Sequence, residues 1–322
     1  MQLRSLGQSG LLVSEVGLGC NNFGMRIGPE EARSVVDAAI DAGITLFDTA
    51  DVYGEMRSES YLGEALGTRR KDVVVATKFG SAVDSSLLKR GASRRWIVEA
   101  CEASLLRLGT DYIDVYQLHW PDPAVPLDET LRALDDLITQ GKVRYIGSSN
   151  LSGWQIADAD WIARDQGLTR FVSTQNLLSL LERAATREIL PACEHFGVGF
   201  LPYFPLASGL LTGKYRGGTA PKESRLANWG ERGRQALSDE NVERVATLAL
   251  WAEQRGRSIL ELAFAWLLSR APVSSVIAGA TTPQQIGANV AAAEWRLTPD
   301  EMTEVAAVLK RLPASLAEIN ES

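Results

Sequence analysis

Three apolar runs in the first half of the chain each end in a side chain that can hold or move a proton. Asp48 ends the run 46–48, Lys78 ends 73–78 and His119 ends 113–119, while Tyr53 follows Asp48 by five residues and precedes a glycine. Such runs predict buried strands, and the tyrosine is predicted in a turn. A lysine at the end of a core strand needs an anionic partner, which Asp48 would supply.

These residue types fit proton donation by a phenol. A tyrosine has an ordinary pKa of about 10, so it is a poor acid at neutral pH unless a fixed cation stabilises the phenolate. Lys78 is the candidate cation. Taken singly, Tyr53 would be an ordinary loop aromatic and His119 a structural hydrogen-bonding residue, but their shared position favours a catalytic interpretation. His195, the other histidine, is better explained as a helix C-terminal residue.

The elements that must position these residues alternate along the whole chain. A hairpin is expected at 1–14, and strands at 15–20, 46–48, 73–78, 113–119, 143–149, 172–176, 198–204 and 275–280. Helices are expected at 29–42, 59–66, 93–108, 127–140, from 152, and at 182–196, 240–254, 258–269, 283–293 and 300–311. Eight alternating units predict an α/β fold, a closed (β/α)8 TIM barrel in one domain over 1–322. The hairpin would plug its bottom, extra C-terminal helices would follow the eighth unit, and the candidate residues would meet at the C-terminal face of the strands.

The segment 207–238 departs from this alternation. It is rich in Gly, Lys and Arg and too long for a simple connection, so we expect a cofactor or substrate loop. Within it, 209–215 superficially resembles a P-loop, but its glycine spacing is one residue short and Tyr215 replaces the magnesium-binding Ser or Thr. No GxGxxG follows a strand, so a Rossmann domain is not expected.

Composition excludes several classes of protein. The 322 residues are 45% hydrophobic and carry a net charge of -7, so nucleic acid is not an expected partner, because phosphate binding needs a basic patch. Cys20, Cys101 and Cys193 are widely spaced without a CxxC pair, which predicts neither a disulfide framework nor a zinc site and fits a reducing cytoplasm. The apolar cluster at 11–13 is too short for a signal peptide, and no run approaches about 18 apolar residues, so no membrane span is expected.

Taken together, the motifs resemble the aldo-keto reductase family over essentially the whole chain. The matching stretches are 47–50 with 53–54, 77–78, 118–122, 146–150, 203–215 and 279–289. The resemblance implies an NADP-dependent oxidoreductase whose catalytic tetrad is Asp48, Tyr53, Lys78 and His119. Carbonyl reduction needs a hydride at carbon and a proton at oxygen. Tyr53 would give the proton, Lys78 would lower its pKa, Asp48 would orient Lys78, and His119 would hydrogen-bond the carbonyl oxygen.

The same resemblance implies a cofactor extended over the barrel mouth. Residues that would hold the nicotinamide end are Ser149, Asn150, Gln175 and the stacking Tyr203. Residues that would follow the pyrophosphate are Leu206, Ser208, Leu210, Lys214 and a closing Arg225. Residues that would hold the adenosine end are Gly279, Thr281, Gln285 and Asn289. Phosphates near the loops after the last two strands also suit this fold physically. Tyr203 and Leu206 as plain core, and Asn289 as a polar helix residue, remain alternatives.

The choice between NADPH and NADH depends on the last of these stretches. Many members of the family carry a basic residue where this chain has Thr281-Thr282, which removes an obvious partner for a 2′-phosphate. NADPH remains the expected cofactor because Gln285 and the helix N-terminus near Pro283 can bind an anion. NADH use stays open.

For the substrate, Phe23, Trp120 and Trp229 are expected to wall an apolar pocket. This favours small-molecule aldehydes or ketones with a hydrophobic or aromatic body. No arginine pair marks a carboxylate or phosphate substrate.

Two other classes of protein remain open. One is an NADPH-binding sensor or channel-accessory subunit with little turnover, built on the same barrel. The other is an unrelated barrel enzyme, such as a metal-dependent lyase or hydrolase. With two histidines and no clustered ligands, no metal site is expected. No obligate protein partner is expected. The sequence itself does not indicate the oligomeric state, and the resemblance slightly favours a monomer over a dimer.

Overall fold

Eight parallel strands form a closed barrel. A computed structural model describes residues 1–215, 226–227 and 230–310. The strands are β3 (Val16–Gly19), β4 (Leu46–Asp48), β5 (Val74–Phe79), β6 (Ile113–Leu118), β7 (Val143–Ser149), β8 (Ser173–Leu177), β9 (Gly199–Tyr203) and β10 (Val276–Gly279). They pair in the order β10-β3-β4-β5-β6-β7-β8-β9, and a parallel bridge between Phe200 and Val273 joins the last strand to the first. The predicted (β/α)8 TIM barrel is confirmed.

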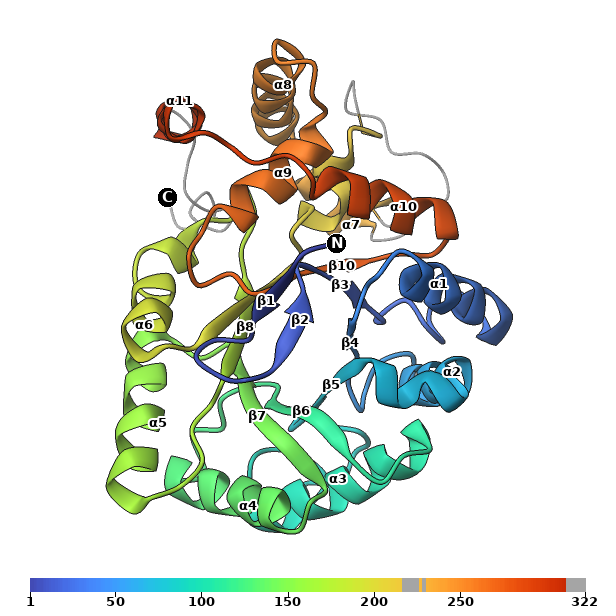
Figure 1. Cartoon of the computed structure of the whole chain (residues 1–322), viewed down its shortest axis with the longest axis vertical. Helices are drawn as coiled ribbons and strands as arrows, with labels where there is room; N and C mark the ends of the chain where they lie inside the picture. The colour runs from blue at the N-terminus through green and yellow to red at the C-terminus, as the bar shows by residue number, and fades with distance from the viewer. Residues whose placement is uncertain (216–225, 228–229, 311–322) are drawn as a thin grey trace.

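Helices surround the strands on the outside (Figure 1). The helices of the ring are α1 (Pro29–Asp41), α2 (Arg57–Leu66), α3 (Arg94–Leu108), α4 (Leu127–Thr139), α5 (Gly153–Gln166), α6 (Ile189–Phe196), α9 (Ile259–Leu268) and α10 (Pro283–Ala292). Beyond the ring lie α8 (Asp239–Glu253) and α11 (Pro299–Lys310). Several begin where a serine side chain accepts a hydrogen bond from the first turn, as Ser93, Ser152 and Ser258 do.

Two expected elements differ from the structure. The helix expected at 182–196 begins only at Ile189, after a 3-10 turn, η2 (Ala184–Thr186). Pro191 lacks a backbone donor and restricts the residue before it, so it is tolerated only in the first turn of a helix. The expected loop 207–238 contains a 3-10 helix, η3 (Ala207–Thr212), and a short helix, α7 (Glu231–Ala236).

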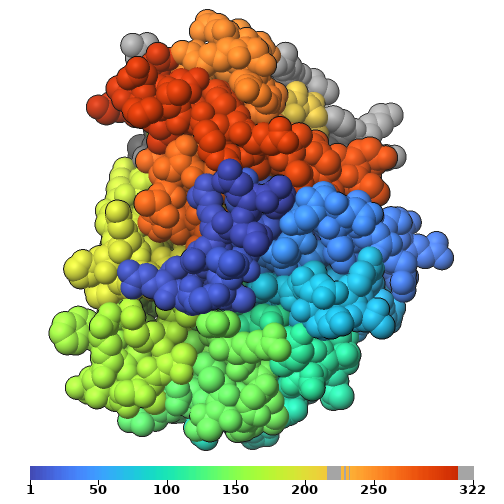
Figure 2. Space-filling model, in the orientation of Figure 1, coloured from blue at the N-terminus to red at the C-terminus, as the bar shows by residue number. Residues whose placement is uncertain are grey.

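The N-terminal hairpin closes one end of the barrel. Strands β1 (Leu3–Ser5) and β2 (Leu12–Ser14) pair antiparallel. Leu6 and Val13, both fully buried, pack against barrel residues that include Leu46, Val74 and Val115. The hairpin crosses the centre of the barrel in Figure 1 and covers the middle of the same face in Figure 2. Solvent is thereby excluded from the apolar floor of the barrel.

The barrel interior changes from apolar to polar toward the C-terminal ends of the strands. The strand register aligns Asp48 with Ala76, and Lys78 with Gln117. Because side chains alternate along a strand, Asp48 faces the same side as Leu46, and Lys78 the same side as Ala76. Leu46 and Ala76 belong to the apolar cluster above the hairpin. The polar side chains therefore form the next layer, at the C-terminal mouth.

Candidate active site

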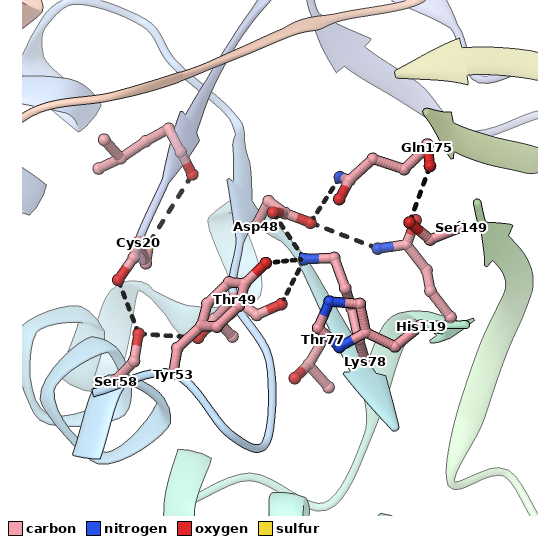
Figure 3. A network of polar contacts seen from close by, with 12 residues as sticks. Cys20, Asp48, Thr49, Tyr53, Ser58, Thr77, Lys78, His119, Ser149 and Gln175 are labelled. Carbon is pink, nitrogen blue, oxygen red and sulfur yellow. Dashed lines mark hydrogen bonds and ion pairs between the residues drawn. The ribbon is translucent and has the colours of Figure 1, made fainter. Parts of the chain in front are cut away.

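A buried ion pair lies at the centre of the mouth. Lys78 Nζ donates to Asp48 Oδ2 over 2.7 Å and to the Thr49 carbonyl over 2.8 Å (Figure 3). The Lys78 side chain is fully buried and that of Asp48 is 5% exposed. Burial alone would lower the pKa of Lys78, but the interactions with Asp48 and Tyr53 outweigh it, so its pKa is raised. Lys78 is therefore charged at neutral pH.

Tyr53 lies beside this pair on the loop between β4 and α2. Its hydroxyl is 3.4 Å from Lys78 Nζ, and the ammonium lies 4.8 Å from the ring centroid. The following glycine, Gly54, has a φ of 59°, and a Cβ there would lie 2.1 Å from the Phe23 carbonyl oxygen. Only glycine fits this turn. The sequence therefore places a glycine where the turn that presents Tyr53 requires one.

The pKa of Tyr53 was expected to be lowered, but in the structure it is raised. Burial raises it above its ordinary value, and the charge of Lys78 opposes this shift without cancelling it. Asp48 and Asp51 add to the raising. Lys78 thus lowers the pKa of Tyr53 as expected, but desolvation raises it by more.

His119 is held in its neutral form. Burial, and then the charge of Lys78, lower its pKa to about 3. Its Nδ1 lies 3.1 Å from Ser81 Oγ, and its ring meets the Tyr53 ring edge to face at 5.8 Å between centroids. A neutral imidazole whose Nδ1 accepts a hydrogen bond from the Ser81 hydroxyl carries its proton at Nε2 and presents an N–H there. Ser81 was not predicted, because nothing in the pattern of the 79–92 connection indicates which residue reaches back to the histidine.

Two amides fix the second oxygen of Asp48. Gln175 Nε2 donates to Asp48 Oδ1 over 2.9 Å, and Gln117 Nε2 donates to the same oxygen over 3.3 Å. Gln175 was expected at the nicotinamide; its side-chain amide nitrogen donates to the carboxylate, and the residue also lines the cavity at the mouth. Gln117 was not predicted. It lies two residues before His119, so the alternation of side chains along a strand places it on the same inward face, and this signal could have identified it.

A second hydrogen-bonded chain joins β7 to β9. Tyr203 donates its hydroxyl to Asn150 Oδ1 over 2.8 Å, and Asn150 Nδ2 donates to the His119 carbonyl over 2.9 Å. Ser149 Oγ donates to the Gln175 carbonyl over 2.7 Å. These bonds fix the rim residues relative to the ion pair, which itself sits on β4 and β5.

A cavity of about 960 Å³ opens above these groups. Predicted site residues that line it are Asp48, Tyr53, His119, Trp120, Ser149, Asn150, Gln175, Tyr203, Leu206, Ser208, Lys214, Gly279, Thr281, Gln285 and Asn289. Lys78 lies beneath its floor. The structure therefore brings together residues that span most of the chain, from β4 to α10.

Two of the predicted site residues, Phe23 and Leu210, do not line the cavity. The Phe23 side chain is fully buried in the main hydrophobic core and Leu210 is 2% exposed in the same core, so neither side chain lines the cavity. Phe23 turns inward because its loop folds back on itself, with Gly24 N–H bonded to the Ile27 carbonyl. Arg225 and Trp229 lie outside the described residues.

The loop after β3 contributes polar side chains that were not predicted. Asn21, Asn22 and Arg26 line the cavity. The same loop packs against the turn beside Tyr53, because Gly24 approaches Gly54 closely. Phe204 and Leu177, also unpredicted, line the cavity with Trp120. The walls are therefore mixed and not simply apolar.

The opposite rim carries an unusual turn and a lysine. Ala207 and Ser208 adopt left-handed φ values of 46° and 58°, which are costly for residues other than glycine and are typical of functional turns. Gly209 has a φ of 101°, and a Cβ there would lie 3.3 Å from Lys214 Nζ. Glycine thus lets the Lys214 ammonium lie close to this turn, on the cavity wall. An aromatic ring, an ammonium beside a turn on the cavity wall and a polar far end are features that an extended dinucleotide needs.

A comparison with protein families decides the class. The model of the aldo/keto reductase family matches residues 15–310. The chain belongs to the aldo/keto reductase family. Membership supports an oxidoreductase of the general kind that reduces carbonyl groups with a nicotinamide cofactor. An unrelated barrel lyase or hydrolase is thereby excluded.

Full-length relatives carry two kinds of name. A probable voltage-gated potassium channel subunit beta from Oryza sativa subsp. japonica is 39% identical, over 97% of this reductase and 98% of its own length. A putative subunit of the same kind from Schizosaccharomyces pombe is 37% identical, over 97% and 94%. A versiconal hemiacetal acetate reductase from Aspergillus parasiticus is 36% identical, over 94% and 95%.

The described residues contain neither a candidate metal cluster nor a candidate membrane span. No group of three or more His, Cys, Asp or Glu side chains within it is arranged to hold a metal ion. No helix in the same residues has the length and apolarity needed to cross a membrane.

Proposed function

We propose that this reductase converts aldehydes and ketones to alcohols with NADPH, using Tyr53 as the general acid. The observation that carries the proposal is the position of the Lys78 ammonium, 2.7 Å from Asp48 Oδ2 and 3.4 Å from the Tyr53 hydroxyl. A buried cation stabilises a phenolate far more than a phenol. It therefore favours transfer of the Tyr53 proton to an oxygen that is gaining negative charge.

The four side chains divide the work of protonating a carbonyl oxygen. When bound, a reduced nicotinamide supplies the hydride for the carbonyl carbon. Tyr53 donates its proton to the oxygen, and Lys78 stabilises the phenolate left behind. Asp48 keeps Lys78 charged and oriented. His119, neutral because of its low pKa, donates a hydrogen bond from Nε2 to the same oxygen.

Cofactor contacts are assigned by position around the cavity. Ser149, Asn150, Gln175 and Tyr203 would hold the nicotinamide end. Leu206, Ser208 and Lys214 would follow the phosphates, and Gly279, Thr281, Gln285 and Asn289 would hold the adenosine end.

The choice of NADPH depends on Gln285. Its carbonyl oxygen accepts from the Thr281 N–H over 2.8 Å, so its amide nitrogen is left to donate to a 2′-phosphate at the start of α10. The test is kcat/KM with each cofactor. Comparable values for NADH would contradict the preference.

The substrate is assigned from both walls of the cavity. Trp120, 52% exposed, supplies an apolar surface with Leu177 and Phe204, while Asn21 and Arg26 lie on the wall beside the Tyr53 turn. Carbonyl compounds that combine an apolar body with a polar substituent fit this lining better than purely hydrophobic ones. We also propose a cytoplasmic protein, because all three cysteines are buried free thiols, as a reducing compartment favours.

The rice and fission-yeast relatives support a second candidate function, that of an NADPH-binding channel-accessory subunit with little turnover. The presence of all four tetrad side chains favours the enzyme. Slow turnover of every carbonyl, together with tight NADPH binding and a stable complex with a partner protein, would favour the subunit.

The deciding experiment is NADPH consumption with a panel of aldehydes, ketones, quinones and sugars. Activity on any of them that is lost in Tyr53→Phe supports the proposal. Activity that survives in that variant at nearly the wild-type rate contradicts the role of Tyr53.

A further inference from the structure

Asp51 is a buried acid that the proposed mechanism does not use. It lies on the loop between Asp48 and Tyr53, and its side chain is 1% exposed. Its backbone N–H donates to the Lys78 carbonyl over 3.2 Å, so the residue is fixed to the strand that carries the ammonium. Neither carboxyl oxygen has a hydrogen-bond partner within the described chain. A buried acid without partners is costly when charged, so the burial of Asp51 calls for an explanation.

The groups around Asp51 already balance one another in charge. On the tetrad side, Lys78 is paired with Asp48. On the outer side, Glu59 of α2, fully buried, accepts from Arg107 Nε of α3 over 2.7 Å and from Thr77 Oγ1 over 2.6 Å. An ionised Asp51 would therefore add one uncompensated negative charge between two neutral pairs.

Two phenols complete these surroundings. Tyr116 of β6 is fully buried, and its hydroxyl has no partner in the described chain. Burial is the main cause that raises its pKa, and Asp51 adds to the shift. Tyr53 is the other, and a negative charge on Asp51 likewise raises its pKa. The charge state of Asp51 thus acts directly on the proposed proton donor.

Burial and the neighbouring Glu59 raise the pKa of Asp51 to about 8, against the opposing effects of Arg107, the Val52 N–H and Lys78. The Val52 N–H is near enough to favour the charged form, but it does not meet the geometry of a hydrogen bond to either carboxyl oxygen. At neutral pH the carboxyl group therefore carries its proton, in agreement with its unpartnered oxygens and with the charge balance around it.

We propose that Asp51 is a positioning residue that must stay protonated for Tyr53 to act as an acid. When it ionises, its negative charge counteracts the ammonium of Lys78 and makes the phenol a weaker proton donor. This proposal rests on the role of Tyr53 proposed above. It assigns the alkaline loss of activity to a carboxylic acid and not to Tyr53 itself.

The first test is the pH dependence of kcat for carbonyl reduction, with each enzyme normalised to its own maximum. Wild type should lose rate as the pH rises through about 8, whereas Asp51→Asn should hold its rate beyond that pH. Glu59→Gln removes the charge that raises the pKa of Asp51, so its loss of rate should begin at lower pH. The control Asp84→Asn, an exposed acid on the β5–α3 loop, should follow wild type. Coincident alkaline limbs for wild type and Asp51→Asn would overturn the proposal.

A second test does not depend on activity. Because the pKa of Asp51 is raised in the folded protein, the folded state retains a proton that the unfolded state loses above about pH 4, so the stability of wild type falls as the pH rises from about 4 to about 8. The Tm difference between Asp51→Asn and wild type should therefore grow between pH 5 and pH 8. For Asp84→Asn it should stay constant. A constant difference for Asp51→Asn means that the folded protein holds an ionised Asp51, and the proposal fails. If wild type reduces no carbonyl, the proposed function fails, and the Tm measurement still decides whether Asp51 holds its proton.

Discussion

The two sides of the barrel mouth are built differently. On one side, Asp48, Lys78 and His119 come from the ends or rims of β4, β5 and β6, are buried, and are fixed by several hydrogen bonds each. On the other side, residues 204–215 contain the short 3-10 helix η3, at the start of which Ala207 and Ser208 have left-handed backbone conformations. Its cation, Lys214, forms no ion pair within the described chain closer than 4.0 Å.

This difference indicates which side determines rate and which determines affinity. Groups that act on charge developing in a transition state must be oriented before the reaction, and burial on strand ends achieves that. Groups that hold a phosphate chain interact equally with ground state and transition state, so they change affinity without changing the chemical step. Substitutions on the two sides should therefore affect different kinetic constants.

The largest effect is expected from Tyr53→Phe. The variant loses the proton donor and keeps the ring, so kcat should fall by about 10²–10⁴-fold while the Kd for NADPH changes by less than about twofold. Stopped-flow turnover and fluorescence titration measure the two constants. Tyr61→Phe, on the outer helix α2, is the matched control and should change neither. A Kd that rises as steeply as kcat falls would remove the distinction between the two sides.

Lys78→Met should affect both rate and stability. The phenolate loses its stabilising cation, so kcat should fall by about 10²-fold. Asp48 would remain buried without a charged partner, which costs about 3 kcal/mol or more when a buried pair is broken, and Tm should drop.

The double variant Asp48→Asn with Lys78→Met sharpens this result. It removes the uncompensated charge, so it should recover part of the lost Tm and none of the lost rate. Recovery of both would mean that the pair acts only through stability.

The same contrast explains what could be predicted from sequence. A lysine that ends an apolar run needs a buried anion, so the contact of Lys78 with Asp48 followed from the strand pattern alone. The inward course of Phe23 did not, because a four-residue fold-back in the loop after β3 decides it. Nor did the left-handed turn at Ala207, since residues other than glycine carry no signal for such a conformation. Asp51 resembled any acidic loop residue until its burial was known.

On the loop side, Lys214→Met should raise the Kd for NADPH about 10–100-fold, the range expected for a charge-assisted hydrogen bond to a phosphate. At saturating NADPH, kcat should change by less than about twofold. Isothermal titration and steady-state kinetics provide the two measurements. The control is Lys71→Met, an exposed lysine in the 3-10 helix η1 (Gly67–Asp72) that does not line the cavity. A fall in kcat as large as that of Lys78→Met would show that both sides act on the chemical step.

The smallest expected effect is the absence of an acidic limb from His119. A free histidine would change charge near pH 6.5, but burial and Lys78 lower the pKa of His119 to about 3, so the imidazole is neutral throughout the range from pH 5 to pH 7. The sign is fixed by the direction of the shift, because a lowered pKa extends the neutral form to lower pH. The kcat profile should therefore be flat within about twofold over that range. A limb near pH 6.5 would assign a protonated imidazolium to the reaction, provided that it persists in His195→Asn, which removes the other of the two histidines. A flat profile in both proteins means that His119 acts as a neutral hydrogen-bond donor, leaving Tyr53 as the acid on the strand-end side.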